Sequence, residues 1–178
     1  MAAPLLVVTG PPGAGKSTVA AVLAGRFPES ALVEVDAFFG FLRAGAIEPW
    51  LPAARAQNET VIQAAGSAAG RYARGGLATV VEGMVGPWFL PAFARAAAVD
   101  DLDYLVLLPS AATCAARVSS RVGHVFDDED VTLAMHDQFS TTTIDGRHVL
   151  RDPPDDVDAL AAQVMAALED GQLRHPGL

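Results

Sequence analysis

Residues 7–20 read VVTGPPGAGKSTVA, an apolar run that breaks into three glycines and two prolines before a helix-forming stretch. Residues 10–17 of it fit the pattern G-x-x-x-x-G-K-[ST] in full, directly after a run typical of a buried strand. Glycines in such a loop let successive backbone N–H groups turn inward around a phosphate, and the following helix adds the positive end of its dipole. The stretch therefore predicts a strand, a phosphate-binding loop and a helix.

Lys16 is the only lysine of the chain, against eleven arginines. A compact ammonium and a flat guanidinium are not interchangeable, so we expect Lys16 to reach the β- and γ-phosphates of a nucleoside triphosphate. Ser17 is expected to offer its hydroxyl to Mg²⁺. The loop thus predicts ATP and Mg²⁺ as cofactors. The residues expected to contact the nucleotide here are Gly10, Gly13, Ala14, Gly15, Lys16, Ser17 and Thr18.

The composition of the chain indicates which classes of partner and which compartment to expect. The 178 residues carry a formal charge of −9, and no cluster of basic residues offers a track for nucleic acid. No run approaches the roughly 18 apolar residues of a membrane span, and the first residues lack the basic region of a signal peptide. The single cysteine, Cys114, excludes an internal disulfide. We therefore expect a cytoplasmic protein that binds neither nucleic acid nor membrane.

Strand-like and helix-like segments alternate along the chain. Expected strands cover residues 5–9, 31–36, 78–82, 102–108 and 147–151. Expected helices cover residues 16–26, 50–74, 110–122, 127–139 and 157–168, with another from about residue 89. This alternation predicts an α/β fold with a parallel sheet, whose ligands bind at the carboxyl ends of the strands. Thr9, Asp36, Glu82 and Pro109 lie at those ends.

Two classes of triphosphate-binding protein fit poorly. A GTPase needs the motif N-K-x-D, which a chain with Lys16 as its sole lysine cannot contain. A motor or AAA-type ATPase normally carries a hydrophobic strand that ends in Asp-Glu, and a larger domain. Small kinases remain.

The loop, together with VEVDAFF at 33–39, VVEG at 80–83 and ARVSSRVGH at 116–124, resembles P-loop kinases of the nucleoside-monophosphate-kinase-like group. The chain is most similar in pattern to the short enzymes that resemble chloramphenicol phosphotransferase. Adenylylsulfate kinase, gluconate kinase and zeta-type toxins resemble it less closely. The resemblance spans residues 4 to about 151 and implies a five-stranded sheet of order 2-3-1-4-5 in a three-layer fold, with a mobile lid at about 117–140. At this length we expect residues 1–178 to form a single domain.

Four side chains follow from this reading as candidates. Asp36 matches the position of a catalytic carboxylate, and a carboxylate beside the γ-phosphate can take a proton from an acceptor hydroxyl. Its alternative role is to cap the next helix. Glu82 is expected at the metal or the substrate, or else as a buried acid bonded to loop amides. By resemblance, Arg117 covers the adenine and Arg121 clamps the phosphates; the alternative is a solvated helix face.

The acceptor is indicated by aromatic residues. Seven of the twelve lie in two stretches after strands that end in acids: Phe38, Phe39, Phe41, Trp50, Trp88, Phe89 and Phe93. They either wall an apolar acceptor site, with Phe39, Trp88 and Arg55 in contact, or pack the helices on the sheet. An aromatic wall favours a bulky hydroxyl compound such as an antibiotic. The alternative is a zeta-toxin-like or nucleotide-sensing protein that acts on a sugar nucleotide.

Overall fold

The computed structural model describes residues 3–120 and 129–176 as one sheet covered by helices on both faces. Five parallel strands lie in the order β2-β3-β1-β4-β5, which confirms the predicted α/β class and strand order. A sixth strand, β6, pairs antiparallel with β4, so the expectation of five strands was one short. The strands are β1 (Leu5–Thr9), β2 (Ser30–Glu34), β3 (Ala78–Glu82), β4 (Asp101–Leu108), β5 (Val149–Arg151) and β6 (Arg174–Pro176).

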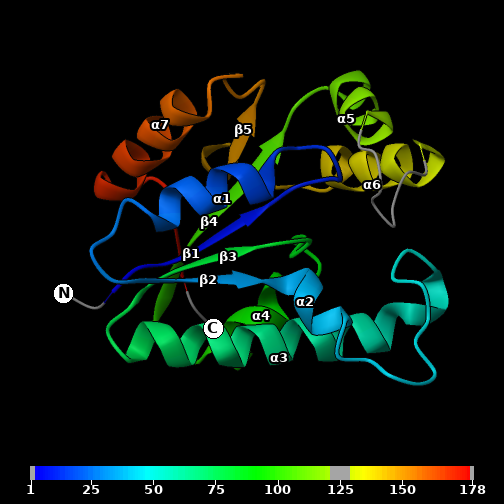
Figure 1. The fold of residues 1–178 in the computed structure, drawn as a ribbon, viewed down its shortest axis with the longest axis horizontal. Coiled ribbons are helices and arrows are strands. Elements are labelled where there is room, and N and C mark those ends of the chain that lie inside the picture. The colour runs from blue at the N-terminus through cyan, green and yellow to red at the C-terminus, as the bar shows by residue number, and fades with distance from the viewer. Residues whose placement is uncertain (1–2, 121–128, 177–178) are drawn as a thin grey trace.

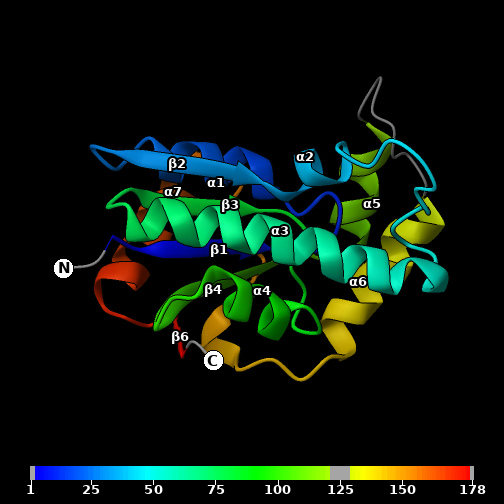
Figure 2. The same ribbon diagram turned by 90° about the horizontal axis from the view of Figure 1, so that it is seen from below.

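The helices form two layers around this sheet. They are α1 (Lys16–Ala24), α2 (Val35–Phe39), α3 (Arg55–Arg74), α4 (Leu90–Ala97), α5 (Ala111–Ser119), α6 (Glu129–Thr141) and α7 (Val157–Glu169). Short 3-10 turns, η1 (Pro52–Ala54) and η2 (Gly146–His148), precede α3 and β5. In Figure 1, α1 and α7 cover one face of the sheet, and α3 and α4 cover the other. Figure 2, seen from below, shows α3 running along the sheet toward α6. Within the described residues, no helix has the length and apolarity to cross a bilayer.

Strand β2 ends two residues earlier than predicted. Its last pair with β3 joins Glu34 to Glu82, and the chain then turns directly into α2. Asp36 therefore lies in the first turn of α2 instead of at a strand end, where a carboxylate also suits the positive end of the helix dipole.

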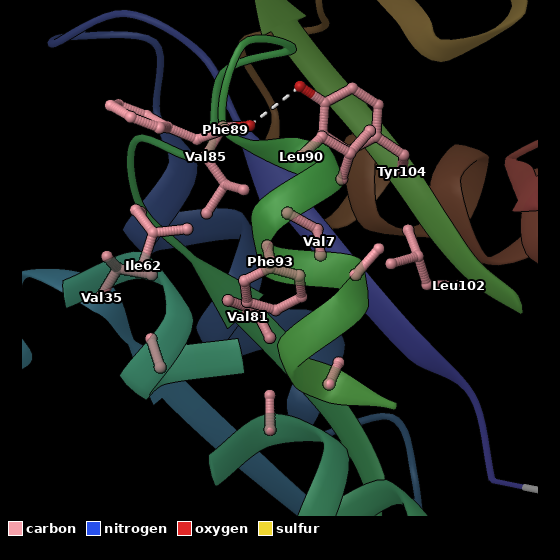
Figure 3. Packing of buried hydrophobic residues seen from close by; sticks show 14 of the residues in the cluster. Val7, Val35, Ile62, Val81, Val85, Phe89, Leu90, Phe93, Leu102 and Tyr104 are labelled. Atoms are coloured by element: carbon pink, nitrogen blue, oxygen red, sulfur yellow. Dashed lines mark hydrogen bonds between the residues drawn. The ribbon is translucent and has the colours of Figure 1, made fainter. Parts of the chain in front are cut away.

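The core has two halves because side chains of β1 alternate across the sheet. Leu6 and Val8 pack with residues of α1 and α7, whereas Leu5 and Val7 face α3 and α4. All five residues of β1 are buried, as the continuous apolar run predicted. Figure 3 shows the second half, with Phe93 of α4 between the sheet and α3.

A hydrogen bond from strand β4 holds the segment between β3 and α4 in place. Tyr104 of β4 is 1% exposed and donates its hydroxyl hydrogen to the backbone oxygen of Val85 at 2.9 Å (Figure 3). A buried phenol with a satisfied hydroxyl stabilises a single position of its partner. This bond therefore holds the segment that carries Trp88.

Helices α3 and α4 approach closely because glycines face α4. A Cβ atom on Gly70 would clash with the backbone oxygen of Ala97, and one on Gly66 would lie 2.7 Å from the backbone oxygen of Phe93. The Arg74 guanidinium donates to the oxygens of Ala97 and Ala98 at the end of α4. These contacts fix the spacing of the layer below the sheet.

We predict that Gly70→Ala lowers the free energy of unfolding by about 1–3 kcal/mol, because the added methyl group forces apart two packed backbones. Gly146→Ala is the matched control: the new Cβ meets no atom within 4 Å among the described residues. Urea unfolding curves measure both. Equal stability of the two variants would show that α4 can shift freely.

Candidate active site

The loop between β1 and α1 folds as the sequence predicted. Gly10, Gly13 and Gly15 have φ angles of 146°, 77° and 94°, which side-chain-bearing residues rarely adopt. A Cβ atom on Gly13 would also lie 3.0 Å from the Cα atom of Cys114 in α5. Among the described residues, no side chain caps the start of α1, so its first backbone N–H groups remain available to an anion.

Two cations contact this loop. Lys16, the first residue of α1, donates from Nζ to the backbone oxygen of Pro11 at 2.9 Å. Arg117 of α5 donates from Nη1 to the oxygen of Gly13 at 3.4 Å and from Nη2 to the Asp155 carboxylate at 3.0 Å. The loop therefore has an ammonium on its own helix and a guanidinium from the opposite side.

A pocket of about 310 Å³ lies beside the loop at this guanidinium. Gly13, Gly15 and Thr18 line it from the loop and α1, Arg117 from α5, and Pro153 from the segment after β5. The family resemblance implies that Arg117 covers the adenine, and it also implies an adenine-contact loop at residues 151–153, after the last strand. The pocket brings Arg117 and the last of these residues to one place.

The acidic side of the site lies at the end of β3. Glu82 is 5% exposed, and its Oε2 accepts a hydrogen bond of 3.1 Å from the Ser17 hydroxyl. Burial raises the pKa of Glu82 above its usual value and the Asp36 carboxylate adds to this, while Lys16 acts in the opposite direction. Glu82 is thus a carboxylate whose charge is costly in the unliganded protein.

Ser17 and Glu82 are the described residues best placed to hold Mg²⁺. Both supply oxygen, which Mg²⁺ prefers, and Mg²⁺ usually takes only one or two protein ligands beside phosphates and water. Among residues 3–120 and 129–176, no group of three or more His, Cys, Asp and Glu side chains is arranged for a metal. The donor set therefore fits a metal that arrives with a nucleotide.

A larger cavity of about 1160 Å³ opens on the other side of the loop. It joins Lys16, Ser17, Asp36 and Glu82 to an apolar chamber lined by residues of α2, α3, α6 and the segment after β3. The predicted acceptor contacts Phe39, Trp88 and Arg55 all line it. Residues far apart in sequence thus meet in one cavity at the carboxyl ends of the strands.

The aromatic residues divide between this cavity and the core. Phe39, Trp50, Trp88 and Phe89 line the cavity, and the ring of Trp88 lies 5.1 Å from that of Phe139, centroid to centroid. Phe93 is fully buried in the core cluster, which agrees with the packing alternative left open for these residues. Its helix α4 presents Phe93 to α3, whereas Trp88 precedes that helix.

One wall of the cavity was missed in the sequence. Four residues of α6 line it: Val131, Ala134, Met135 and Gln138. Their spacing of three and four places them on one helix face, which was the available signal. Arg121, predicted to clamp phosphates, lies outside the described residues, as does part of the expected lid.

The comparisons give the family. Residues 5–143 match the family model described as "AAA domain", so the chain belongs to this family of P-loop domains. The sequence analysis judged an AAA-type protein to fit poorly because no strand ends in Asp-Glu. At the level of the family, this judgement was wrong. The comparison with curated proteins found no match.

Solved structures, among them small-molecule kinases, share the fold. A sugar kinase from Janibacter sp. HTCC2649 is similar, with a TM-score of 0.69 and 18% identity over 94% of this chain and 95% of that one. The APS kinase of Mycobacterium tuberculosis, in complex with AMPPNP and APS, has a TM-score of 0.69 and 19% identity over 94% and 98%. The tunicamycin resistance protein of Deinococcus radiodurans has a TM-score of 0.65 and 16% identity, over 98% of this chain and 99% of that one. At these identities the likeness shows a P-loop kinase-like fold.

We predict that Lys16→Ala abolishes nucleotide-dependent activity and that Lys16→Arg largely fails as well, because the guanidinium is too broad for a loop built around an ammonium. Calorimetric titration with ATP and Mg²⁺, together with turnover, measures both. Arg26→Lys is the control, since Arg26 forms an exposed ion pair with Asp158 outside both cavities. Native turnover of Lys16→Arg would contradict a catalytic role of the loop.

We predict that Glu82→Gln stabilises the unliganded protein near neutral pH, since a raised pKa means that ionised Glu82 disfavours the folded state. The gain should shrink as the pH falls through the folded pKa and vanish below the usual pKa of a glutamate, where both states are protonated. Mg²⁺-dependent ATP affinity should meanwhile fall by about 10- to 100-fold, as for other groups that orient a metal ligand.

Thermal melts across pH and ATP titrations with and without Mg²⁺ measure the two effects. Glu34→Gln is the matched control, because Glu34 pairs with Glu82 in register but is exposed and lines neither cavity. The Glu34 charge is the smallest cause of the raised pKa of Glu82, so this variant should change stability less and leave the Mg²⁺ dependence unchanged. A lower melting temperature of unliganded Glu82→Gln at neutral pH would contradict the prediction.

Proposed function

We propose that this protein is an ATP-dependent phosphotransferase that moves the γ-phosphate of ATP to a hydroxyl group of a small molecule. One observation carries the proposal: a single cavity joins the phosphate loop and two carboxylates to an apolar chamber of its own. Its volume of about 1160 Å³ exceeds the roughly 300–1,000 Å³ of a typical single-ligand pocket, so a second ligand has room beside the phosphates.

In this proposal, the phosphate donor ATP lies across the phosphate loop. The backbone N–H groups of the loop and the start of α1 bind the β-phosphate, and the nucleoside extends into the smaller pocket at Arg117. Ser17 and Glu82 would hold Mg²⁺, which would supply neutralisation of phosphate charge when bound. The kinase-like structural neighbours support this assignment, and the neighbouring APS kinase structure contains AMPPNP.

Asp36 is the proposed base. Its carboxylate lines the cavity and accepts the proton of the acceptor hydroxyl, whose oxygen then forms a bond to the γ-phosphorus. The bond between the γ-phosphorus and the bridging oxygen breaks, and ADP leaves. Lys16 balances the charge that moves onto the bridging oxygen, and Arg121 remains a predicted second cation.

The acceptor proposed is a bulky, largely apolar hydroxyl compound, and antibiotics are candidates. Similar folds serve proteins named for a sugar, for APS and for tunicamycin resistance, so the fold does not choose among acceptors. The cavity wall supports an apolar acceptor: within the described lining, Arg55 is the one cation besides Lys16, and aromatic and aliphatic side chains dominate. A sugar nucleotide, the alternative acceptor, would bring two phosphates to this single exposed arginine.

A transfer screen with γ-³²P-labelled ATP tests the proposal over hydroxyl-bearing antibiotics, sugars and sugar nucleotides. Phosphate should appear on a hydroxyl compound in the wild type and in no reaction of Lys16→Ala. ATP binding without transfer to any compound would reject the kinase and favour a nucleotide sensor. Transfer to sugar nucleotides alone would favour the toxin-like alternative.

We predict that Asp36→Asn lowers kcat for transfer by about 10²- to 10⁴-fold, the usual weight of a positioned general base. ATP affinity should hold or rise slightly, because a negative charge near the γ-phosphate is removed. Steady-state kinetics for both substrates measure this. The control is again Glu34→Gln, which removes a charge two residues away but outside the cavity. A native rate for Asp36→Asn would leave Asp36 as a helix-start residue only.

A further inference from the structure

Exposed apolar side chains gather beside the large cavity. The described part of the chain leaves eight large apolar side chains exposed, and five of them lie in residues 40–51, between α2 and η1. We call these five the apolar rim: Phe41, Leu42, Ile47, Trp50 and Leu51. Phe41 is 69% exposed. Single exposed apolar residues are ordinary on a protein surface, whereas a group of them marks a place that binds something.

The apolar rim continues the wall of the cavity at both of its ends. Phe39 and Gly40 line the cavity directly before the rim begins, and Trp50 and Leu51 line it where the rim ends. Phe41, Leu42 and Ile47 lie between these two places in the chain. In Figures 1 and 2 this segment lies at the same end of the molecule as α6, which also lines the cavity. A ligand that fills the apolar chamber can therefore extend onto the rim.

Hydrogen bonds hold the rim in place. The backbone N–H and oxygen of Ile47 both bond to the Gln57 side chain of α3, at 2.8 and 2.7 Å. The backbone oxygen of Pro49 accepts a further bond of 2.7 Å from Asn58. At the other end, the N–H of Phe41 bonds back into α2 at 3.3 Å. The rim is thus anchored to two helices with its apolar side chains exposed, which suits a fixed binding surface better than a strap that closes.

The charge of the segment favours an uncharged occupant. Residues 40–51 carry one basic and one acidic side chain, Arg43 and Glu48, and the whole chain has a formal charge of −9. A protein surface that binds anionic lipid bilayers carries a cluster of Lys and Arg, which this segment lacks. Apolar side chains without such a cluster suit a hydrocarbon chain, and the continuity with the cavity suits a chain that belongs to the ligand inside it.

We propose that the acceptor is an amphiphile: its hydroxyl-bearing end lies in the cavity, and an apolar chain of the alkyl kind extends across the apolar rim. The chain covers Phe41 and Ile47, whereas a compact acceptor would leave them in water. This inference rests on the proposed function, because it takes the large cavity as the acceptor site. It adds that the acceptor reaches beyond the cavity and that chain length governs its affinity.

Three alcohols test the inference: 1-hexanol, 1-octanol and 1-decanol carry the same hydroxyl group and differ only in chain length. Their binding to the full chain with Mg²⁺–AMPPNP is measured by calorimetry and by the emission of Trp50 and Trp88, which both line the cavity. Affinity should rise by about 2- to 4-fold for each added methylene, the range expected when a methylene leaves water partly or fully.

Variants of the rim separate its contribution from that of the cavity, because Phe41 and Ile47 do not line the cavity themselves. Phe41→Ser and Ile47→Ser should each reduce the gain in affinity from 1-hexanol to 1-decanol by about 3- to 10-fold and leave 1-hexanol nearly unchanged. Tyr72→Ser is the matched control, since Tyr72 of α3 is 47% exposed and lines neither cavity. It should leave all three affinities unchanged.

Asp36→Asn separates the chain from the reacting hydroxyl group. Any contact of the hydroxyl with Asp36 is the same in the three probes, so this variant should change their affinities by one common factor and leave the gain per methylene unchanged. A gain per methylene that disappears in Asp36→Asn would contradict the inference. Circular dichroism and melting curves check that each variant folds.

The wild-type series decides the inference even if a variant does not fold. Equal affinity for the three alcohols, no binding of 1-decanol, or a full chain-length gain in folded Phe41→Ser and Ile47→Ser would overturn it. Self-association that Phe41→Ser abolishes, with alcohol binding unchanged, would assign the rim to a second copy of the chain instead. In Trp88→Phe, protection of Trp50 from acrylamide by Mg²⁺–AMPPNP alone would assign it to a closing strap.

The transfer screen is read separately. A chain-length gain that depends on the rim, without phosphate transfer to any compound, keeps the amphiphile site and rejects the reaction. Transfer to compact hydroxyl compounds, without a gain that depends on the rim, keeps the reaction and rejects the amphiphile.

Discussion

The phosphate loop depends on the absence of a side chain at Gly13. Its backbone packs against the Cα and carbonyl atoms of Cys114, so the loop is held by α5 as well as by its own strand and helix. Gly10, where a Cβ would clash with the backbone oxygen of Leu107, makes the same approach to β4. Both neighbours belong to the β4–α5 unit. The N–H groups that face an anion are thus positioned by a part of the chain about a hundred residues away.

The packing that positions the phosphate loop also allows a charged residue, Glu82, at the end of a buried strand. Glu82 ends a strand whose five residues are all buried, and its pKa is raised by that burial. Lys16 and the Ser17 hydroxyl, both on the helix that the loop positions, offset part of this cost. Ionised Glu82 lowers the stability of the unliganded fold. This cost is consistent with a role of Glu82 in binding a cation that arrives with the ligand.

The sequence was most informative where local chemistry decides the structure. The glycine loop, the buried strand β1 and the strand order all agree with prediction, because a phosphate loop and alternating elements permit few arrangements. Asp36 was expected on a strand, yet β2 ends at its last pair with Glu82, which no local pattern of β2 reveals.

Which aromatic residue packs in the core and which lines the cavity also depends on tertiary contacts. Phe93 and Trp88 lie five residues apart in similar surroundings, and only the approach of α3 to α4 separates them. The contribution of α6 to the cavity wall could not be predicted for the same reason. Its apolar face shows in the sequence, but what that face covers depends on how α6 packs against α5 and β4.

Gly13 and Gly15 line both cavities, so the loop is a partition with one chamber on each side. Under the proposed function, donor and acceptor then occupy the protein together and meet only at the γ-phosphorus. A direct transfer across this partition is a single displacement, which inverts the configuration at phosphorus. A route through a phosphorylated side chain would take two displacements and restore the original configuration. The architecture of the loop is thereby tied to the handedness of an isotopically chiral phosphate group.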